Sequence, residues 1–263
     1  MLIIFDNMKK QTLINFLETK YPIKNAEEWD FVGFSINVEK DKIEKVLICL
    51  DVNLFSVTKA IKEKVDLIIS FHPFCFASEW EEIFAYDISK KKLVKQLIEN
   101  QINVYSIHTN FDKSKKGTKY WFIKELKLEE KIINNYTFST IVKFNRSFNS
   151  LIKLMKNNLK INNVITNFEK NINSKINKIY FAPGAGNVYE FLKHNEIEKV
   201  DLLVTSDMKW NEQQLLNSIG IKYVLIPHKT EDVFVKGLTY QILDKFPNLK
   251  IVKFKMNDFN KAF

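Results

Sequence analysis

The sequence has little cysteine, no long apolar run and only a short apolar start. Its two cysteines, Cys49 and Cys75, are too few for a disulfide framework in a chain of 263 residues. Both lie in apolar runs, so we expect buried thiols, with weak metal binding by Cys75 as the alternative. No apolar run approaches the roughly 18 residues that cross a bilayer, and MLIIFDNMKK is too short in apolar residues for a signal peptide. We therefore expect a cytoplasmic protein that does not associate with membranes.

Glycine and proline are also scarce, at six and five residues, and no segment rich in Gly, Pro or Ser reads as a linker. The hydrophobic fraction of 46% is enough for a substantial core, in one large or two small domains. The net charge of +9 could attract phosphate-bearing partners. Lysine is spread along the whole chain beside Asn and Ile, however, which indicates a general compositional bias. We therefore do not expect nucleic acid as a main partner.

Short apolar runs alternate with segments of helical periodicity, and turn residues or charges bound each run. This alternation is typical of parallel sheets built from βαβ units, so we expect an α/β fold. The expected strands are Val46–Leu50, Leu67–Ser70, Val104–Ile107, Ile179–Ala182, Leu202–Thr205 and Tyr223–Ile226. The expected helices are Leu54–Glu63, Ser89–Asn100, Val188–His194 and Asn211–Ser218.

The two halves of the chain repeat each other. Glu63–Ser70 (EKVDLIIS) matches Glu198–Thr205 (EKVDLLVT), and His108–Asp112 (HTNFD) lines up with His228–Asp232 (HKTED). The strands that precede these segments also align, and the matches occur in the same order. We therefore expect two similar α/β lobes, each a β-α-β-α-β unit, with the C-terminal part of the chain packing back on the first. The expected lobes are residues 1–126 and 127–263.

Three of the four histidines, His72, His108 and His228, come within two residues of the end of an expected strand. In open α/β sheets, ligands and catalytic groups collect at this edge. Asp112 and Asp232 each follow one of these histidines by four residues. Imidazole and carboxylate together suit Zn²⁺, Fe²⁺ or Mn²⁺, and such a loop can present a ligand with its orienting partner. The alternative for each histidine is a structural role through hydrogen bonding.

Two further segments have a functional and a structural interpretation. The turn Pro183–Asn187 contains two glycines between a strand and a helix, where backbone N–H groups can bind a phosphate; a plain tight turn is the alternative. Trp29–Gly33 places an acid beside a bulky aromatic side chain before the first expected strand. We expect Trp29 to anchor this segment in the core and Asp30 to cap a turn.

Several of these segments resemble the signatures of one protein family. WDFVG at Trp29–Gly33 resembles WDNVG, SFHPF at Ser70–Phe74 resembles SHHPL, and SIHTNFD at Ser106–Asp112 resembles AHTNLD. DMKWN at Asp207–Asn211 and HKTED at His228–Asp232 resemble GDxKxH and HxxxE. Over most of its length the chain is thus similar to the NIF-three-like dinuclear metal-centre family, the GTP cyclohydrolase I type 2 homologues.

The resemblance implies two α/β lobes that face each other across a metal cleft, in a homo-oligomer that forms a ring-shaped hexamer. Carried over by position, the metal ligands are His72, Asp112, His228 and Asp232, with Glu231 as a substitute for the last. The implied cofactor is a divalent metal (Zn, Fe or Mn), with one or two ions per chain.

The sequence departs from the family pattern at three positions. Phe71 occupies the place of the first histidine of HHP and cannot bind a metal. Asn211 replaces the histidine of GDxKxH, and Asp232 is a shorter acid than the expected glutamate. Two metal ions about 3.5–4 Å apart each require their own ligands. We therefore expect this protein to bind one ion firmly and a second weakly or not at all.

The function implied by the resemblance is metal-dependent hydrolysis of GTP or a related nucleotide, with water attacking the imidazole ring and formate leaving. His108 is not among the inherited ligands and is the candidate general acid or base, or a group that orients a ligand. The basic charge and the Gly184/Gly186 turn could hold a triphosphate. Two alternatives stay open: a non-catalytic metal-binding ring that serves as a scaffold or binds partners, and a phosphoesterase with another nucleotide substrate.

Overall fold

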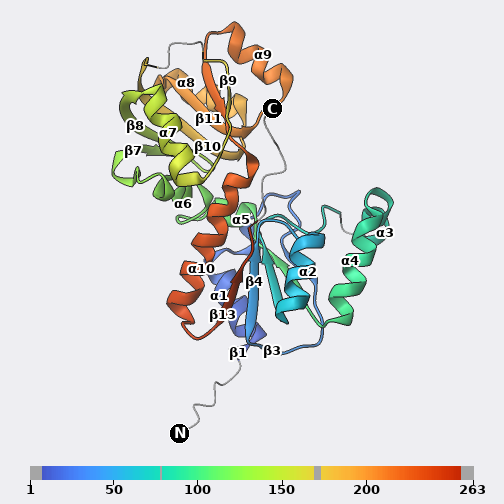
Figure 1. Ribbon diagram of the computed structural model, residues 1–263. Coiled ribbons are helices and arrows are strands. Elements are labelled where there is room, and N and C mark those ends of the chain that lie inside the picture. The colour runs from blue at the N-terminus through green and yellow to red at the C-terminus, as the bar shows by residue number, and fades with distance from the viewer. Residues whose placement is uncertain (1–7, 78, 169–172, 256–263) are drawn as a thin grey trace. The chain divides into compact units, whose positions relative to one another are not determined.

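The computed structural model describes residues 8–77, 79–168 and 173–255 of the chain, which has a mixed α/β fold (Figure 1). These residues divide into two compact units. Unit 1 is built from residues 8–114 and 234–255, and unit 2 from residues 115–233. The chain therefore enters unit 1, crosses into unit 2, and returns to unit 1 through its last long helix.

Unit 1 is centred on a sheet of five strands in the order β13-β4-β5-β6-β2. Four neighbouring strands are parallel and one edge strand, β2, is antiparallel to β6. A separate antiparallel pair joins β1 to β3. The strands are β1 (Met8–Lys9), β2 (Gly33–Ile36), β3 (Lys42–Ile43), β4 (Lys45–Cys49), β5 (Leu67–Ser70), β6 (Asn103–Ser106) and β13 (Lys250–Lys253).

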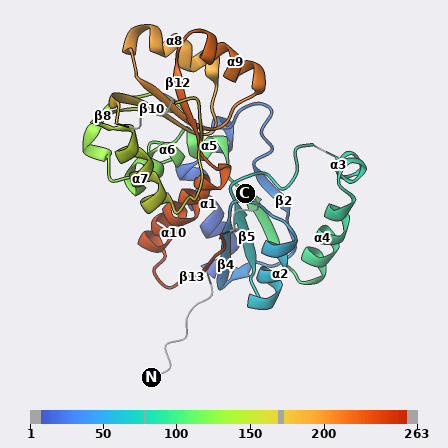
Figure 2. The ribbon, with the colours of Figure 1, turned by 45° about the horizontal axis from the view of Figure 1, so that its top comes forward.

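Helices cover both faces of this sheet. α2 and α4 pack on one face through a core that includes Ala60 and Leu97, while α1 lies on the other, where the Tyr105 hydroxyl donates to Glu18 at 3.1 Å. Figures 1 and 2 agree in placing α1 and α10 opposite α2 and α4. The helices are α1 (Lys10–Lys20), η1 (Ile23–Asn25), α2 (Leu54–Glu63), α3 (Trp80–Tyr86), α4 (Ile88–Glu99), α5 (Thr109–Asp112) and α10 (Val233–Lys245).

Unit 2 contains a six-stranded sheet in the order β7-β8-β10-β11-β12-β9. Its central strands β10, β11 and β12 are parallel, and the flanking strands β8 and β9 run antiparallel to their neighbours. The strands are β7 (Ile132–Asn135), β8 (Thr140–Ser147), β9 (Ile165–Thr166), β10 (Lys175–Ala185), β11 (Leu202–Asp207) and β12 (Lys222–Leu225).

The helices of unit 2 also pack on both faces of their sheet. Phe191 of α8 and Leu216 of α9 share one core cluster with the strands, and Figure 2 shows these two helices on the same side. On the other face Phe122 of α6 contacts Phe181 of β10, with ring centroids 5.7 Å apart. The helices are α6 (Thr118–Glu125), η2 (Glu129–Lys131), α7 (Phe148–Leu159), α8 (Val188–Glu198), α9 (Trp210–Ser218) and η3 (His228–Asp232).

The strands and helices expected from the sequence are confirmed, with ends shifted by a few residues at most at all but the longest strand. The repeated EKVD segment makes the same contacts in both units. Asp66 accepts from the amides of Glu44 and Lys45 at 2.7 and 3.0 Å. In unit 2, Asp201 accepts from Asn177 and Lys178 at 2.7 and 2.9 Å. In each unit this carboxylate therefore ties two neighbouring parallel strands together, β4 to β5 in unit 1 and β10 to β11 in unit 2.

None of the helices in residues 8–77, 79–168 and 173–255 combines the length and apolar character required to cross a membrane.

Candidate metal and acid–base site

The three histidines singled out by the sequence each lie beside an aspartate. The Nδ1 atoms of His72, His108 and His228 lie 2.8, 3.0 and 2.6 Å from carboxylate oxygens. A carboxylate at Nδ1 fixes the imidazole ring and directs the proton to that nitrogen, so that Nε2 is the atom left for a ligand or a proton. The partners are Asp51, Asp30 and Asp207, in that order.

His72 follows β5 in a loop that continues the sheet hydrogen bonding. Its amide donates to the Leu50 carbonyl at 3.0 Å, and the buried Ser70 hydroxyl donates to the His72 carbonyl at 2.8 Å. Asp51 follows the end of the neighbouring parallel strand β4 by two residues, so both residues lie at the carboxyl edge of the unit 1 sheet. The sequence analysis missed Asp51. An acid just after a buried strand was the available signal.

His108 is held more deeply, because Asp30 is only 8% exposed. The second oxygen of Asp30 accepts from the Thr109 amide at 2.9 Å and from the Thr109 hydroxyl. Burial alone would raise the pKa of Asp30, but the hydrogen bonds from His108 and Thr109 outweigh it and lower the pKa. Asp30 therefore stays ionised and orients His108, a larger role than the expected turn cap.

The expectation that Trp29 anchors in the core is wrong. Its side chain is 58% exposed and contacts the His108 ring edge-on, with centroids 6.0 Å apart. The buried position in this segment belongs to Asp30, whose carboxylate has enough hydrogen-bond donors to offset its desolvation.

Phe71, the residue in the place of a family histidine, is a core residue. It has no exposed surface, and its ring lies 5.0 Å from that of Phe234 and 4.9 Å from that of His108. The His72 and His108 rings are 5.3 Å apart. Unit 1 thus presents two oriented imidazoles beside an apolar wall.

Asp112 ends the short helix α5 and is half-buried. Its amide donates to the His108 carbonyl at 3.0 Å, which ties it to the same loop. The four-residue spacing therefore corresponds to one helical turn that begins at His108.

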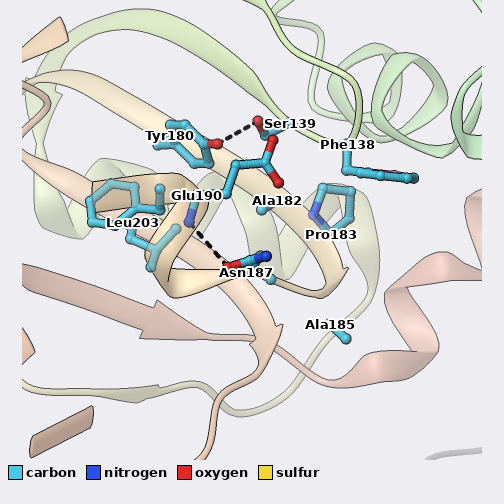
Figure 3. A pocket seen from close by; sticks show the side chains of 11 residues that line it. Phe138, Ser139, Tyr180, Ala182, Pro183, Ala185, Asn187, Glu190 and Leu203 are labelled. Atoms are coloured by element: carbon cyan, nitrogen blue, oxygen red, sulfur yellow. Dashed lines mark hydrogen bonds between the residues drawn. The ribbon is translucent and has the colours of Figure 1, made fainter. Parts of the chain in front are cut away.

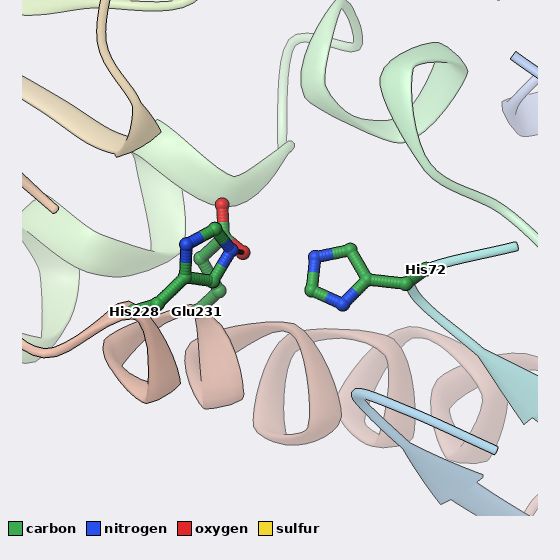
Figure 4. A group of neighbouring side chains, drawn as sticks. All are labelled: His72, His228 and Glu231. Carbon is green, nitrogen blue, oxygen red and sulfur yellow. Dashed lines mark ion pairs between the residues drawn. The ribbon is translucent and has the colours of Figure 1, made fainter. Parts of the chain in front are cut away.

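His228 in unit 2 contacts two acids. Its Nδ1 faces Asp207, and its Nε2 lies 2.7 Å from a carboxylate oxygen of Glu231. Figure 4 shows the His228 ring beside the Glu231 carboxylate on η3, and also the His72 ring on the loop after β5. Burial alone would lower the pKa of His228, but hydrogen bonds to Asp207 and Glu231 raise it to about 10.

Glu231 depends on a glycine for its position. A Cβ atom on Gly184 would lie 2.1 Å from Oε1 of Glu231, and Gly184 has a φ of +83°. The carboxylate of Glu231 is only 4% exposed, whereas Asp232 next to it is half-buried. Of the two acids considered for the last ligand position, Glu231 is within contact distance of the Nε2 atom of His228.

The Pro183–Asn187 turn is not arranged as a phosphate cradle. The Gly184 and Gly186 amides donate to the hydroxyls of Ser206 and Thr205 at 3.2 and 3.0 Å. Both N–H groups are therefore already used within unit 2, and the glycines permit close packing. The expected tight turn is not found either, because β10 continues to Ala185 and pairs with β11 across a register shift between Ala182 and Ala185.

His72, His228 and Glu231 each offer one atom that could bind a metal ion. Two imidazole nitrogens and a carboxylate oxygen are a donor set suited to Zn²⁺, Fe²⁺ or Mn²⁺. Asn211, in the place of a family histidine, is exposed on α9.

The chain was compared with known proteins. Residues 8–260 match the family model of Duf34/NIF3 (NGG1p interacting factor 3). A Mycoplasmopsis pulmonis protein named GTP cyclohydrolase 1 type 2 homolog is 34% identical over 233 residues, which are 88% of this chain and 91% of that protein. A protein of the same name from Methanocaldococcus jannaschii is 29% identical over 93% of this chain and 98% of its own length.

Solved structures have the same fold. A hypothetical protein from Staphylococcus aureus superposes with a TM-score of 0.85 at 24% identity, covering 98% of this chain and all of that one. The structure titled reduced HcgD, from Methanocaldococcus jannaschii, superposes with a TM-score of 0.76 at 28% identity, covering 94% of this chain and 98% of its own.

Proposed function

Because the chain belongs to the Duf34/NIF3 family, we propose that it is a metal-dependent hydrolase that acts on GTP or a related nucleotide. The names of its relatives support the substrate class. The observation that carries the proposal is the environment of His228, whose Nε2 faces the buried acid Glu231 while Asp207 holds Nδ1.

The residues fit a divalent ion. Imidazole held by a carboxylate at Nδ1 and presented together with a second carboxylate is the arrangement that orients metal-binding histidines. A bound ion supplies Lewis-acid chemistry to a hydrolytic reaction. In the proposal, the ligands of one ion are His72, Asp112, His228 and either Glu231 or Asp232.

His108 is the proposed proton-transfer group. Asp30, itself held by the Thr109 amide, fixes the Nδ1 side of the ring, which leaves Nε2 to accept or donate a proton. Its side chain is 14% exposed and borders Phe71.

Phe71 supports one firmly held ion per chain. The phenyl ring has no lone pair that could bind a metal ion. It is buried against Phe234 and His108 and is too well packed to move aside. Metal analysis of protein purified without oxygen should give about one tightly held ion per chain. Two tightly held ions would contradict this part of the proposal.

Turnover measurements test the enzyme. Purified protein with added Fe²⁺, Mn²⁺ or Zn²⁺ should consume GTP or a related nucleotide, and formate release would identify the cyclohydrolase reaction. His72→Ala, Asp112→Ala and His228→Ala should abolish turnover, and His108→Gln should lower kcat while metal content is kept. His194→Gln is the matched control, because this histidine binds Tyr180 and lies outside the ligand set. Phosphate release without formate would identify a phosphoesterase.

The second candidate is a non-catalytic metal-binding ring that serves as a scaffold or binds partners. The replacement of a family ligand by the buried Phe71 favours it. Metal binding without turnover of any nucleotide in a panel would support it over the hydrolase. For both candidates we propose a cytoplasmic homohexamer, and native mass spectrometry that gives six chains would support that assembly.

A further inference from the structure

Unit 2 contains a cavity that shares no residue with the proposed metal ligands. Its volume is about 60 Å³, and it lies between the end of β10, the start of α8 and the chain before β8. Phe138, Tyr180 and Phe191 provide aromatic walls, and Ala182 and Pro183 lie beside them (Figure 3). One water molecule needs about 10–15 Å³ of such volume, so the space can hold a small organic group of a few heavy atoms.

Two polar side chains that line the cavity, Ser139 and Glu190, present hydrogen-bond acceptors. The Ser139 hydroxyl donates to the Tyr180 oxygen at 2.6 Å, and that oxygen lies 2.9 Å from Nδ1 of His194. Because the Ser139 proton is committed to Tyr180, its oxygen presents lone pairs. Ser139 and Tyr180 are each only 2% exposed, and burial raises the pKa of Tyr180 to about 12, so the phenol is neutral.

The charge of the cavity is negative. Among the described residues that line it, Glu190 is the one with a charged side chain. Figure 3 shows its carboxylate extended toward Ser139, with Tyr180 on one side and Phe138 on the other. The Asn187 side chain caps α8 by accepting from the Glu190 amide at 3.0 Å. This carboxylate would repel an anion that entered the cavity.

From these contacts we infer that the cavity binds a small organic ammonium group, such as the end of an aliphatic primary amine. A primary ammonium carries three N–H donors, which match the Glu190 carboxylate and the Ser139 oxygen. Its attached carbon and its charge suit the aromatic walls, because cations are attracted to the faces of Phe and Tyr rings. The ligand class is unusual for a chain of net charge +9, whose surface otherwise favours anions.

The probe for the test is methylammonium chloride, followed by NMR shifts of the amides of residues 186–191 in ¹⁵N-labelled protein at constant ionic strength. Saturable binding is expected with a dissociation constant in the millimolar range, as for any ligand of about two heavy atoms. Sodium formate and methanol, an anion and a neutral molecule of similar size, should bind at least about tenfold more weakly.

Two variants assign the effect to the cavity. Glu190→Gln should weaken methylammonium binding about tenfold, because it removes one charge-assisted contact. Glu196→Gln makes the same charge change at an exposed position of α8 outside the cavity and should leave binding within about twofold. Circular dichroism checks that both variants are folded. Equal binding in Glu190→Gln, a preference for formate, or no saturable shift in the unmodified protein would overturn the inference. Each readout is independent of metal and nucleotide turnover.

Discussion

The two units are alike where their parallel strands begin and differ where these strands end. At the beginning, Asp66 and Asp201 make matching pairs of hydrogen bonds to the preceding strand. In each unit a lysine also donates to the carbonyl of the last residue of the helix before the second of these strands: Lys45 to Glu63 of α2 and Lys178 to Glu198 of α8, at 2.6 and 2.7 Å. These contacts hold neighbouring strands together and are the same in both units.

At the strand ends the units carry different groups. Unit 1 has two neighbouring imidazoles, His72 and His108, each with one aspartate, and Phe71 contacts both rings. Unit 2 has one imidazole, His228, between two acids. The difference shows that one edge of an α/β sheet can retain the contacts that define the fold while the opposite edge changes its chemistry.

The largest expected difference concerns the two orienting aspartates. Asp207→Asn and Asp51→Asn should each lower metal affinity by about 10- to 100-fold, because the carboxylate sets the orientation and basicity of the ligating imidazole. Affinity is measured by competition with a metal indicator, with Asp244→Asn, at an exposed position near the end of α10, as the control. If only Asp207→Asn lowers the affinity, the ion is bound by ligands of unit 2 and His72 is not among its ligands.

The next largest effect is expected from a substitution of Gly184 in unit 2. Gly184→Ala would bring a methyl group against the Glu231 carboxylate at a positive φ, and should destabilise the protein by about 2 kcal/mol or more while lowering metal content. Gly220→Ala is the matched control, since Gly220 also has a positive φ, of +73°, but open space around it. The Tm of both variants measures the difference. Equal losses would show that backbone strain alone is responsible.

The charge on His228 predicts a pH dependence specific to unit 2. With a pKa of about 10, the ring is protonated at pH 8, and a metal ion requires the neutral form. Binding at pH 8 should therefore release about one proton and tighten about tenfold per pH unit up to pH 10. Calorimetry in buffers of different ionisation enthalpy measures this release, and His228→Gln should abolish it.

The same pKa determines the sign of the stability effect in the metal-free protein. The folded value lies above the unfolded value of about 6.5, so His228 stabilises the fold fully below pH 6.5. That contribution is lost as the pH rises through about 10. A rise in stability over this interval would contradict the assignment.

The smallest effect concerns the strand starts. Asp66 is 8% exposed and also pairs with Lys40 at 2.5 Å, while Asp201 is exposed. Asp66→Ala should cost about 1–2 kcal/mol and Asp201→Ala less than about 1 kcal/mol. Hydrogen exchange of the Lys45 and Lys178 amides would report each loss separately. An equal loss of protection in both units would show that burial of the carboxylate is unimportant.

Much of the core could be predicted from the sequence, because local apolar runs mark buried parallel strands. The six expected strands and four expected helices are present, including α2, whose start at Leu54 follows the Asn53 cap and Ser56 capping box. Strands such as β2, β8 and β13 were missed because they lie at or near sheet edges, where burial is one-sided and periodicity is weaker.

The histidines of the candidate site were found because they follow strands, whereas their partners were not all found. Asp51 and Asp207 each lie 21 positions from the histidine that they contact, His72 and His228. Which histidine each acid contacts therefore becomes clear only when the neighbouring strands are known. Trp29 was expected in the core but is exposed, whereas Asp30, expected to cap a turn, is buried. The size of a tryptophan side chain favours its burial. In this segment the aspartate is buried instead, because His108 and Thr109 provide hydrogen-bond donors for its carboxylate.

The order of apolar runs, turn residues and histidines along the chain was sufficient to determine the α/β class, the parallel strands and the edge at which the histidines gather. Those properties depend on local periodicity and on the geometry common to parallel sheets. Only the tertiary structure decided which acid each imidazole contacts, that Phe71 is buried, and that Gly184 makes room for Glu231. Each of these depends on side chains from separate strands that meet within a few ångströms, and no local pattern encodes that distance.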